Sequence, residues 1–173
     1  FLGSMDWMPN IDAIRYFTEE IWPLLKAKNP SVRFTIIGRN PPGWIAELPS
    51  RDSAITVTGT VPDVRPYLAE AAALVVPLRV GGGTRIKIFE AVAAGVPVVS
   101  TSIGMEGLPL THRETILVAD SSREFADATL ELLSDAALAA TISTRARDFV
   151  REKYSWAGVT EIFSGYCRAV VRK

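Results

Sequence analysis

Short apolar runs alternate with helical patterns along this chain, and this alternation restricts the possible folds more than any other feature. Most runs are rich in β-branched residues and end beside glycine, proline or a polar residue. Because the runs are almost continuously apolar, both faces of each strand are expected to be covered. Strands that alternate with helices are typical of a parallel sheet wrapped by helices. The predicted strands are 34–37, 55–58, 73–76, 96–100 and 115–118.

The remaining segments carry apolar residues at helical spacing. We expect the first helix to begin after Asn10 as its N-cap and to be kinked or shortened at Pro23. The pattern therefore predicts one α/β domain over residues 1–173, a Rossmann-like open parallel sheet with helices on both faces. Phe1 and Leu2 read as the end of a strand, so we expect the sequence to be a fragment of a longer protein. Further helices are predicted at 63–71, 85–94, 122–133, 135–153 and 155–171.

The composition excludes several classes of function. The chain has 19 Lys and Arg and 19 Asp and Glu, so it lacks the excess of basic charge that a broad nucleic-acid-binding surface needs. One cysteine, Cys167, excludes an intrachain disulfide and a cysteine-rich zinc site, and it favours a reducing, cytoplasmic location. No apolar stretch approaches the roughly 20 residues that span a bilayer, and no signal sequence stands at the start.

The segment 77–91 carries the clearest sign of chemistry. A predicted strand ends, Gly81, Gly82 and Gly83 follow, and a helix begins. Glycines let backbone N–H groups turn toward a ligand, and a helix N-terminus adds unsatisfied donors and positive charge. This combination is a site for an anion, usually phosphate. We expect Thr84 to be the N-cap of the helix.

Spacing assigns roles to the side chains that follow. Gly83, Lys87 and Glu90 are four and three residues apart, so they share one helical face. Lys87 is expected near the phosphate, and Glu90 one turn further in, where its carboxylate can accept hydrogen bonds from two ribose hydroxyls. Arg85 reaches the same anion only if it belongs to an irregular entry turn. We expect the opposite, apolar face to pack on the sheet, with Ile86, Phe89 and Ala93.

A simpler interpretation stays open at this point. Glycine-rich turns between strand and helix occur in many α/β proteins that bind nothing there, and Lys87 and Glu90 could form an exposed ion pair worth under about 1 kcal/mol. The segment is neither the Walker pattern, because Gly-Lys-Ser/Thr is absent, nor the dinucleotide Gly-x-Gly-x-x-Gly pattern, whose sixth position is Ile86.

An ordered set of motifs resembles the group 1 (family 4) glycosyltransferases, whose GT-B architecture has two Rossmann-like domains. The strongest motif is the glutamate, small-residue, glycine and proline pattern of residues 90–101, Glu-Ala-Val-Ala-Ala-Gly-Val-Pro-Val-Val-Ser-Thr. The other matching segments, in chain order, are Gly3-Ser4-Met5 with Pro9-Asn10, Ile37-Gly38, Val57-Thr58-Gly59-Thr60-Val61, Gly104-Met105-Glu106-Gly107-Leu108 and Tyr154-Ser155-Trp156.

The resemblance implies the C-terminal domain that binds a nucleoside diphosphate sugar. Enzymes of this kind move a hexose-type sugar to an acceptor, usually with retention of configuration and with no metal or other cofactor. Glu90 matches the glutamate that binds the donor ribose, and Gly59, Thr60 and Val61 match the loop that contacts the base. The expected partner is the N-terminal acceptor domain of the same enzyme, and any membrane contact would be made through that domain.

Two departures from the family pattern bear on the mechanism. The first glutamate of the family's Glu-x7-Glu motif falls on Gly82, and its usual basic pair falls on Ser4 and Pro9. A departing diphosphate still needs positive charge. We therefore predict that Arg85 and Lys87 supply it as the catalytic cations. The predicted donor-binding residues are Gly59, Thr60, Val61, Gly82, Gly83, Thr84 and Glu90, and the fragment alone is expected to transfer little or nothing.

Two other functions fit the same pattern. A sugar-nucleotide epimerase of GT-B fold would hold its acid and base groups without a separate acceptor, and a non-catalytic binding domain would account for Gly82. Outside the main loop, Arg39 is expected at the ligand end of the sheet, either solvated or in contact with the base. Tyr154 and Trp156 are predicted to be packing residues. The last helix is expected to leave apolar residues exposed, namely Val159, Ile162, Phe163 and Tyr166.

Overall fold

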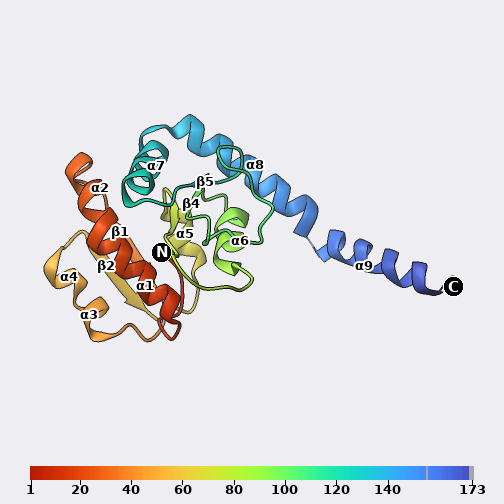
Figure 1. Ribbon diagram of the computed structural model, residues 1–173, viewed down its shortest axis with the longest axis horizontal. Coiled ribbons are helices and arrows are strands. Elements are labelled where there is room, and N and C mark those ends of the chain that lie inside the picture. The colour runs from red at the N-terminus through yellow and green to blue at the C-terminus, as the bar shows by residue number, and fades with distance from the viewer. Residues whose placement is uncertain (155, 172–173) are drawn as a thin grey trace.

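The computed structural model describes residues 1–154 and 156–171, and within its last helix it describes the side chains of 160, 161, 163–168 and 170. Strands and helices alternate as the sequence predicts, and helices surround the strands (Figure 1). The elements, in order, are α1 (Met8–Tyr16), the π-helix η1 (Phe17–Ile21), α2 (Trp22–Lys28), β1 (Phe34–Ile37), α3 (Gly43–Ala46), α4 (Leu48–Arg51), β2 (Ile55–Gly59), α5 (Arg65–Glu70), β3 (Leu74–Val76), α6 (Ile86–Ala93), β4 (Val98–Ser100), β5 (Leu117–Val118), α7 (Ser122–Ser134), α8 (Ala136–Tyr154) and α9 (Trp156–Val171).

All the paired strands run parallel, which confirms the predicted sheet type. Strand β1 pairs with β2, and β4 lies between β3 and β5. Leu2 forms a parallel bridge with Ile37, so the segment before α1 extends the β1–β2 pair. Within the described residues, the ladders form two sheets and not one continuous sheet. Because the strands are parallel, their carboxyl ends lie at a common edge, where ligands bind in folds of this kind.

The first helical segment differs from the prediction at Asn10 and agrees with it at Pro23. Asn10 is not the N-cap, because α1 begins at Met8 after Trp7, with a proline, Pro9, in its first turn. Proline favours that position because its fixed φ suits a helix and its missing N–H is not needed there. The predicted disturbance at Pro23 is present as η1, after which α2 begins with Pro23 in its first turn. Proline cannot donate to the preceding turn, so the hydrogen-bond ladder widens before it.

A buried aromatic cluster joins the amino-terminal helices to α7. Phe17 and Phe125 are almost completely buried and meet edge to face, with ring centroids 6.3 Å apart and an interplanar angle of 83°. Phe34 of β1 stacks against Phe17 at 4.3 Å. The start of α7 is confirmed and is fixed by a capping box, in which Ser121 and Glu124 each bind the other's backbone N–H. Through these contacts α7, which also packs on β4, is held against β1 and the amino-terminal helices.

Helix α6 packs with a different face from the one we predicted. Ile88, Ala91 and Val92 are buried, whereas Ile86 is 62% exposed. The helix contacts β3, β4 and α8. Phe89 also turns away from the sheet and contacts Tyr154 of α8, with ring centroids 5.0 Å apart. The error arose because Ile86, Ile88, Phe89 and Val92 offer two overlapping apolar faces, and only the start of the helix decides between them.

Helix α9 extends away from the rest of the chain (Figure 1). Phe163 and Tyr166 are exposed, as predicted, whereas the side chains of Val159, Ile162 and Trp156 lie outside the described residues. Over residues 1–154 and 156–171, none of the helices combines the length and the apolar character that crossing a bilayer requires.

Candidate functional site

A cavity of about 540 Å³ opens at the carboxyl ends of the strands, between the loops that follow Leu2, β1, β2 and β3 and the start of α6. This is the place at which an open parallel sheet is expected to bind a ligand. All of the residues assigned to the site from the sequence lie on the wall of this cavity. They are Gly59, Thr60, Val61, Gly82, Gly83, Thr84, Arg85, Lys87 and Glu90.

The glycines of the loop before α6 are not equivalent. Gly81 and Gly83 have φ values of 107° and 112°, which side chains rarely tolerate. A Cβ on Gly81 would also lie 2.8 Å from the ring of Pro9. Gly82 has ordinary backbone geometry, and a Cβ there would meet nothing within 4 Å. The fold therefore requires glycine at the outer two positions, whereas it leaves room for a side chain at Gly82.

The entry to α6 is an irregular turn. Thr84 is exposed and is not the N-cap as we predicted, because Arg85 holds that position with a left-handed φ of 51° and no side chain caps the helix. A left-handed residue reverses the chain sharply, which brings the glycine loop back over the helix start. The first backbone N–H groups of α6 therefore lie uncapped beside the cavity, where they favour a negative charge.

Arg85 holds this loop in place. Its guanidinium is 5% exposed and donates hydrogen bonds to the carbonyl oxygens of Gly81 and Gly82, at 2.9 and 3.2 Å. It also donates to the carbonyl of Ile103 at 2.6 Å, so it links the glycine loop to the turn after β4. Its Nε has no partner among the described residues. The structure thus shows a buried cation at the cavity wall, while its predicted contact with a diphosphate stays a prediction.

Lys87 crosses from α6 to the first turn of α1 and to the segment that precedes it. Its Nζ donates to Oδ1 of Asn10 at 2.7 Å and lies 4.3 Å from the centroid of the Phe1 ring. Burial, and secondly the nearby charge of Arg85, lower the pKa of Lys87 from 10.5 to about 7. The first loop lacks its own basic residues at Ser4 and Pro9, and the structure places a lysine from another helix beside it.

Glu90 lies one turn further along α6 and stays accessible from the cavity. Its side chain is exposed, and it lines the same cavity as Gly83 and Lys87. A burial of this carboxylate against the sheet would have removed it from the site, and the structure shows the opposite. A carboxylate in this position can accept hydrogen bonds from neighbouring hydroxyls of a ligand.

The loop after β2 forms another part of the cavity wall. Gly59 ends the strand with a φ of 68°, and its carbonyl accepts hydrogen bonds from the backbone N–H of Gly38 at 3.2 Å and from the hydroxyl of Thr58 at 3.0 Å. The loop after β1 is thereby tied to the loop after β2. Thr60 and Val61 follow on the cavity wall.

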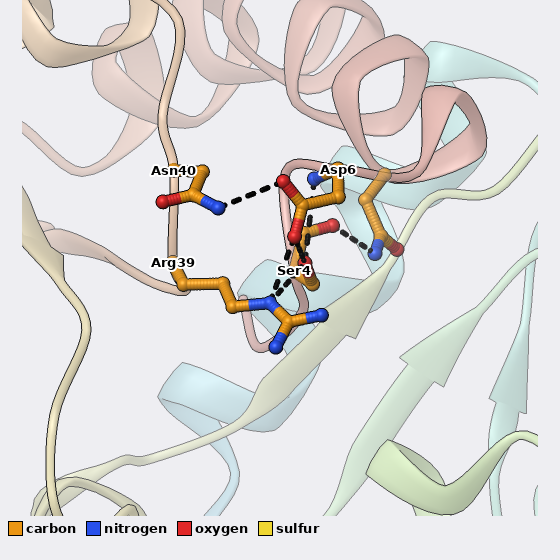
Figure 2. A network of polar contacts seen from close by, with 5 residues as sticks. Ser4, Asp6, Arg39 and Asn40 are labelled. Carbon is orange, nitrogen blue, oxygen red and sulfur yellow. Dashed lines mark hydrogen bonds and ion pairs between the residues drawn. The ribbon is translucent and has the colours of Figure 1, made fainter.

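Several cavity residues were missed by sequence reasoning. Trp7 is 51% exposed and approaches the position that a Cβ on Gly83 would take, at 3.9 Å. Asn10 holds Lys87 and was assigned to a helix cap. A polar network around Asp6 joins Ser4 to the loop after β1 (Figure 2). The rule that ligands bind at strand ends and the family resemblance of residues 3–5, 9–10 and 37–38 both pointed to these loops, but neither assigned a role to Trp7 or Asp6.

The described part of the chain contains no cluster of three or more His, Cys, Asp or Glu side chains that could hold a metal ion. The expectation that the reaction needs no metal rests on the family resemblance and stays a prediction.

Comparisons with known proteins place the chain in one family. The family model described as Glycosyl transferases group 1 matches residues 1–135. An uncharacterized 44.6 kDa protein in the cps region of Klebsiella pneumoniae is 25% identical over 161 residues, which is 89% of this chain and 42% of the relative.

Solved structures show the same fold. A structure of TarM from S. aureus, in complex with fondaparinux, alpha-GlcNAc-glycerol and UDP, has a TM-score of 0.79 and 22% identity, covering 95% of this chain and 34% of TarM. The C-terminal domain of a group 1 glycosyl transferase (LpcC) from Francisella tularensis has a TM-score of 0.69 and 22% identity, covering 81% of this chain and 80% of that domain. This chain therefore spans less than half of the Klebsiella relative and of TarM, but most of the isolated LpcC domain.

Proposed function

Because the chain belongs to the group 1 glycosyl transferases and has the fold of their C-terminal GT-B domain, we propose that its cavity binds the nucleoside diphosphate sugar that donates the sugar. The single observation that carries this proposal is the joint position of Lys87, Glu90 and the uncapped start of α6 on one cavity wall.

The diphosphate would lie at the start of α6. Backbone N–H groups near Gly83 and Thr84, the helix N-terminus and the ammonium of Lys87 offer donors and positive charge there. Arg85 adds a buried positive charge behind the loop. The TarM structure contains UDP, which is a ligand of this class, and its fold matches this chain.

The ribose would be held by Glu90, whose carboxylate can accept hydrogen bonds from the two vicinal hydroxyls. The base would then lie toward Gly59, Thr60 and Val61, which line the same cavity on a different loop. In this arrangement the anionic diphosphate meets the positive charge at the start of α6, and the uncharged base meets the loop of Gly59, Thr60 and Val61.

Sugar transfer develops negative charge on the departing diphosphate and positive charge on the sugar. Fixed cations at the diphosphate stabilise that charge, and we assign this role to Lys87, with Arg85 acting from behind the loop. The transferred sugar is proposed to be a hexose, moved with retention of configuration. The acceptor and any base that acts on it would come from an N-terminal domain, so the chain alone should bind the donor and transfer little. A cytoplasmic location stays a prediction.

Calorimetric titration with UDP and 2′-deoxy-UDP tests the assignment of Glu90. We expect Glu90→Gln to weaken UDP binding about tenfold or more, because a charged acceptor of hydroxyl hydrogen bonds is lost. The loss should be much smaller for the deoxy ligand, which lacks one of those hydroxyls. Glu114→Gln, at an exposed glutamate away from the cavity, is the matched control. Equal losses for both ligands, or none, would contradict the ribose assignment.

A non-catalytic binding domain is the second candidate, and Gly82 is the observation that favours it, because a glutamate of the family motif is missing there. If neither Glu90→Gln nor Lys87→Met changes the affinity for UDP or GDP, this second candidate is favoured.

A further inference from the structure

A network of polar side chains outside the diphosphate end of the cavity has no role in the function proposed above (Figure 2). Asp6 accepts hydrogen bonds from Nε of Arg39 at 2.8 Å, from Nδ2 of Asn40 at 2.9 Å and from the hydroxyl of Ser4 at 2.9 Å. The hydrogen bonds from Asn40 and Ser4, with the charge of Arg39, hold the pKa of Asp6 below its ordinary value, so the carboxylate stays ionised. The network joins the loop before α1 to the loop after β1.

Arg39 enters this network through one nitrogen. Its Nε donates to Asp6 and, at 3.1 Å, to the hydroxyl of Ser4. Among the described residues, no other side chain accepts a hydrogen bond from its two terminal nitrogens, which extend beyond the network in Figure 2. The side chain is 63% exposed and lies on the cavity wall. Four N–H donors of a planar fork are therefore available at a fixed place.

Stability does not account for this arrangement. An exposed ion pair contributes little, because water and salt screen it. Its structural effect is to hold the guanidinium in one orientation before a ligand arrives, which lowers the entropy lost on binding. Such an arrangement is what a recognition residue needs.

The position of Arg39 indicates which part of a nucleotide it would meet. Strands β1 and β2 are paired up to Ile37 and Gly59, so Arg39 follows the strand next to the loop of Gly59, Thr60 and Val61. Lys87 and the start of α6 stand elsewhere on the cavity wall and already offer positive charge to the diphosphate. Arg39 is thus placed beside the wall assigned to the base.

A guanidinium only donates hydrogen bonds, so it distinguishes bases by their acceptors. Guanine presents two adjacent acceptors, O6 and N7, and uracil presents O4, whereas adenine and cytosine place an amino donor at the corresponding position. We propose that Arg39, positioned by Asp6 and Ser4, selects keto bases, uracil or guanine, over adenine and cytosine. This inference rests on the proposed donor site and deepens it by naming the class of base.

Titration of the chain with UDP, GDP, ADP and CDP tests the inference. We expect the wild type to bind UDP or GDP about tenfold or more tightly than ADP and CDP, as one well-placed contact to a base edge provides. Arg39→Ala should abolish that preference. Arg39→Lys should abolish most of it while keeping the charge, because an ammonium does not reproduce the planar fork.

Two further variants complete the design. Asp6→Asn leaves Arg39 in place but weakens its anchor, and it should reduce the preference without removing binding. Arg113→Ala is the matched control, since Arg113 is an exposed arginine paired with Glu131 outside the cavity. The inference is overturned if the wild type shows no preference for keto bases, or if Arg39→Ala weakens all four ligands equally, as a phosphate contact would. If the wild type binds none of the four, the donor site itself is refuted along with it.

Discussion

Because of Lys87, we expect a nucleoside diphosphate sugar to bind more weakly as the pH rises. Burial, and secondly the charge of Arg85, lower the pKa of this lysine from 10.5 to about 7. A diphosphate beside the ammonium would favour the charged form and raise the pKa again. Above neutral pH, binding therefore requires the uptake of a proton, and affinity should fall as the pH rises.

The size of the effect follows from the fraction of Lys87 that is charged before the ligand binds. With a pKa of about 7, this fraction is roughly 0.9 at about pH 6 and roughly 0.03 at about pH 8.5. If only the charged form binds the diphosphate tightly, affinity falls roughly 30-fold over this range, which corresponds to about 2 kcal/mol.

Calorimetry with a UDP-sugar measures both parts of this prediction, because its diphosphate diester does not titrate in this range. We expect the affinity of the wild type to fall as calculated. Titrations near the upper end of the range, in two buffers with different heats of ionisation, should show an uptake of about one proton per site.

Variants of the lysine provide the controls. Lys87→Arg keeps its charge across the range, so its binding should not depend on pH. Lys87→Met should bind weakly at every pH. The reasoning is refuted if the wild type binds with constant affinity and takes up no proton while Lys87→Met still loses affinity, because the lysine would then act without titrating.

Six other substitutions test the site and the fold. Gly3→Ala should weaken UDP binding with little loss of stability, because the new Cβ displaces the side-chain amide of Asn10 and the end of Lys87. Gly43→Ala, in open space, should change neither in titration and thermal melts. Arg85→Ala should lower the free energy of unfolding by about 2–4 kcal/mol in urea titrations, since it removes three hydrogen bonds from a buried guanidinium to loop carbonyls. Arg85→Gly, which relieves the left-handed φ, should lose less. Ser121→Ala should cost about 1 kcal/mol in the same assay, through the lost capping box. Gly82→Glu should melt within a few degrees of the wild type, and a large loss would show that the loop does require glycine there.

The strands could be predicted because their signal is local. Each apolar run ends where its chain leaves the sheet, and the strand ends then indicate the edge at which the loops gather. That is why the nine residues assigned from the sequence share one cavity, although they come from two separate loops and one helix.

The errors share a cause, which is that contacts between distant residues decided between local alternatives. Asn10 is a good N-cap by residue type, yet it lies inside α1 and binds Lys87, 77 positions away. Thr84 is also a good N-cap by residue type. The N-cap at this turn is instead Arg85, whose buried guanidinium is held by the carbonyl of Ile103. The same turn sets the phase of α6 and so turns Ile86 outward. Spacing along the chain contains no information about these contacts.

The ammonium of Lys87, which stands beside the first loop, depends on the space around Gly3. A Cβ on Gly3 would lie 2.9 Å from Nζ of Lys87 and 2.8 Å from Nδ2 of Asn10. A larger residue at position 3 and the ammonium of Lys87 would therefore compete for the same volume. With glycine at this position, one ammonium can reach the loop and be held by Asn10. The same enclosure lowers its pKa, so the positive charge that this chain supplies from α6 is complete only when an anion binds beside it.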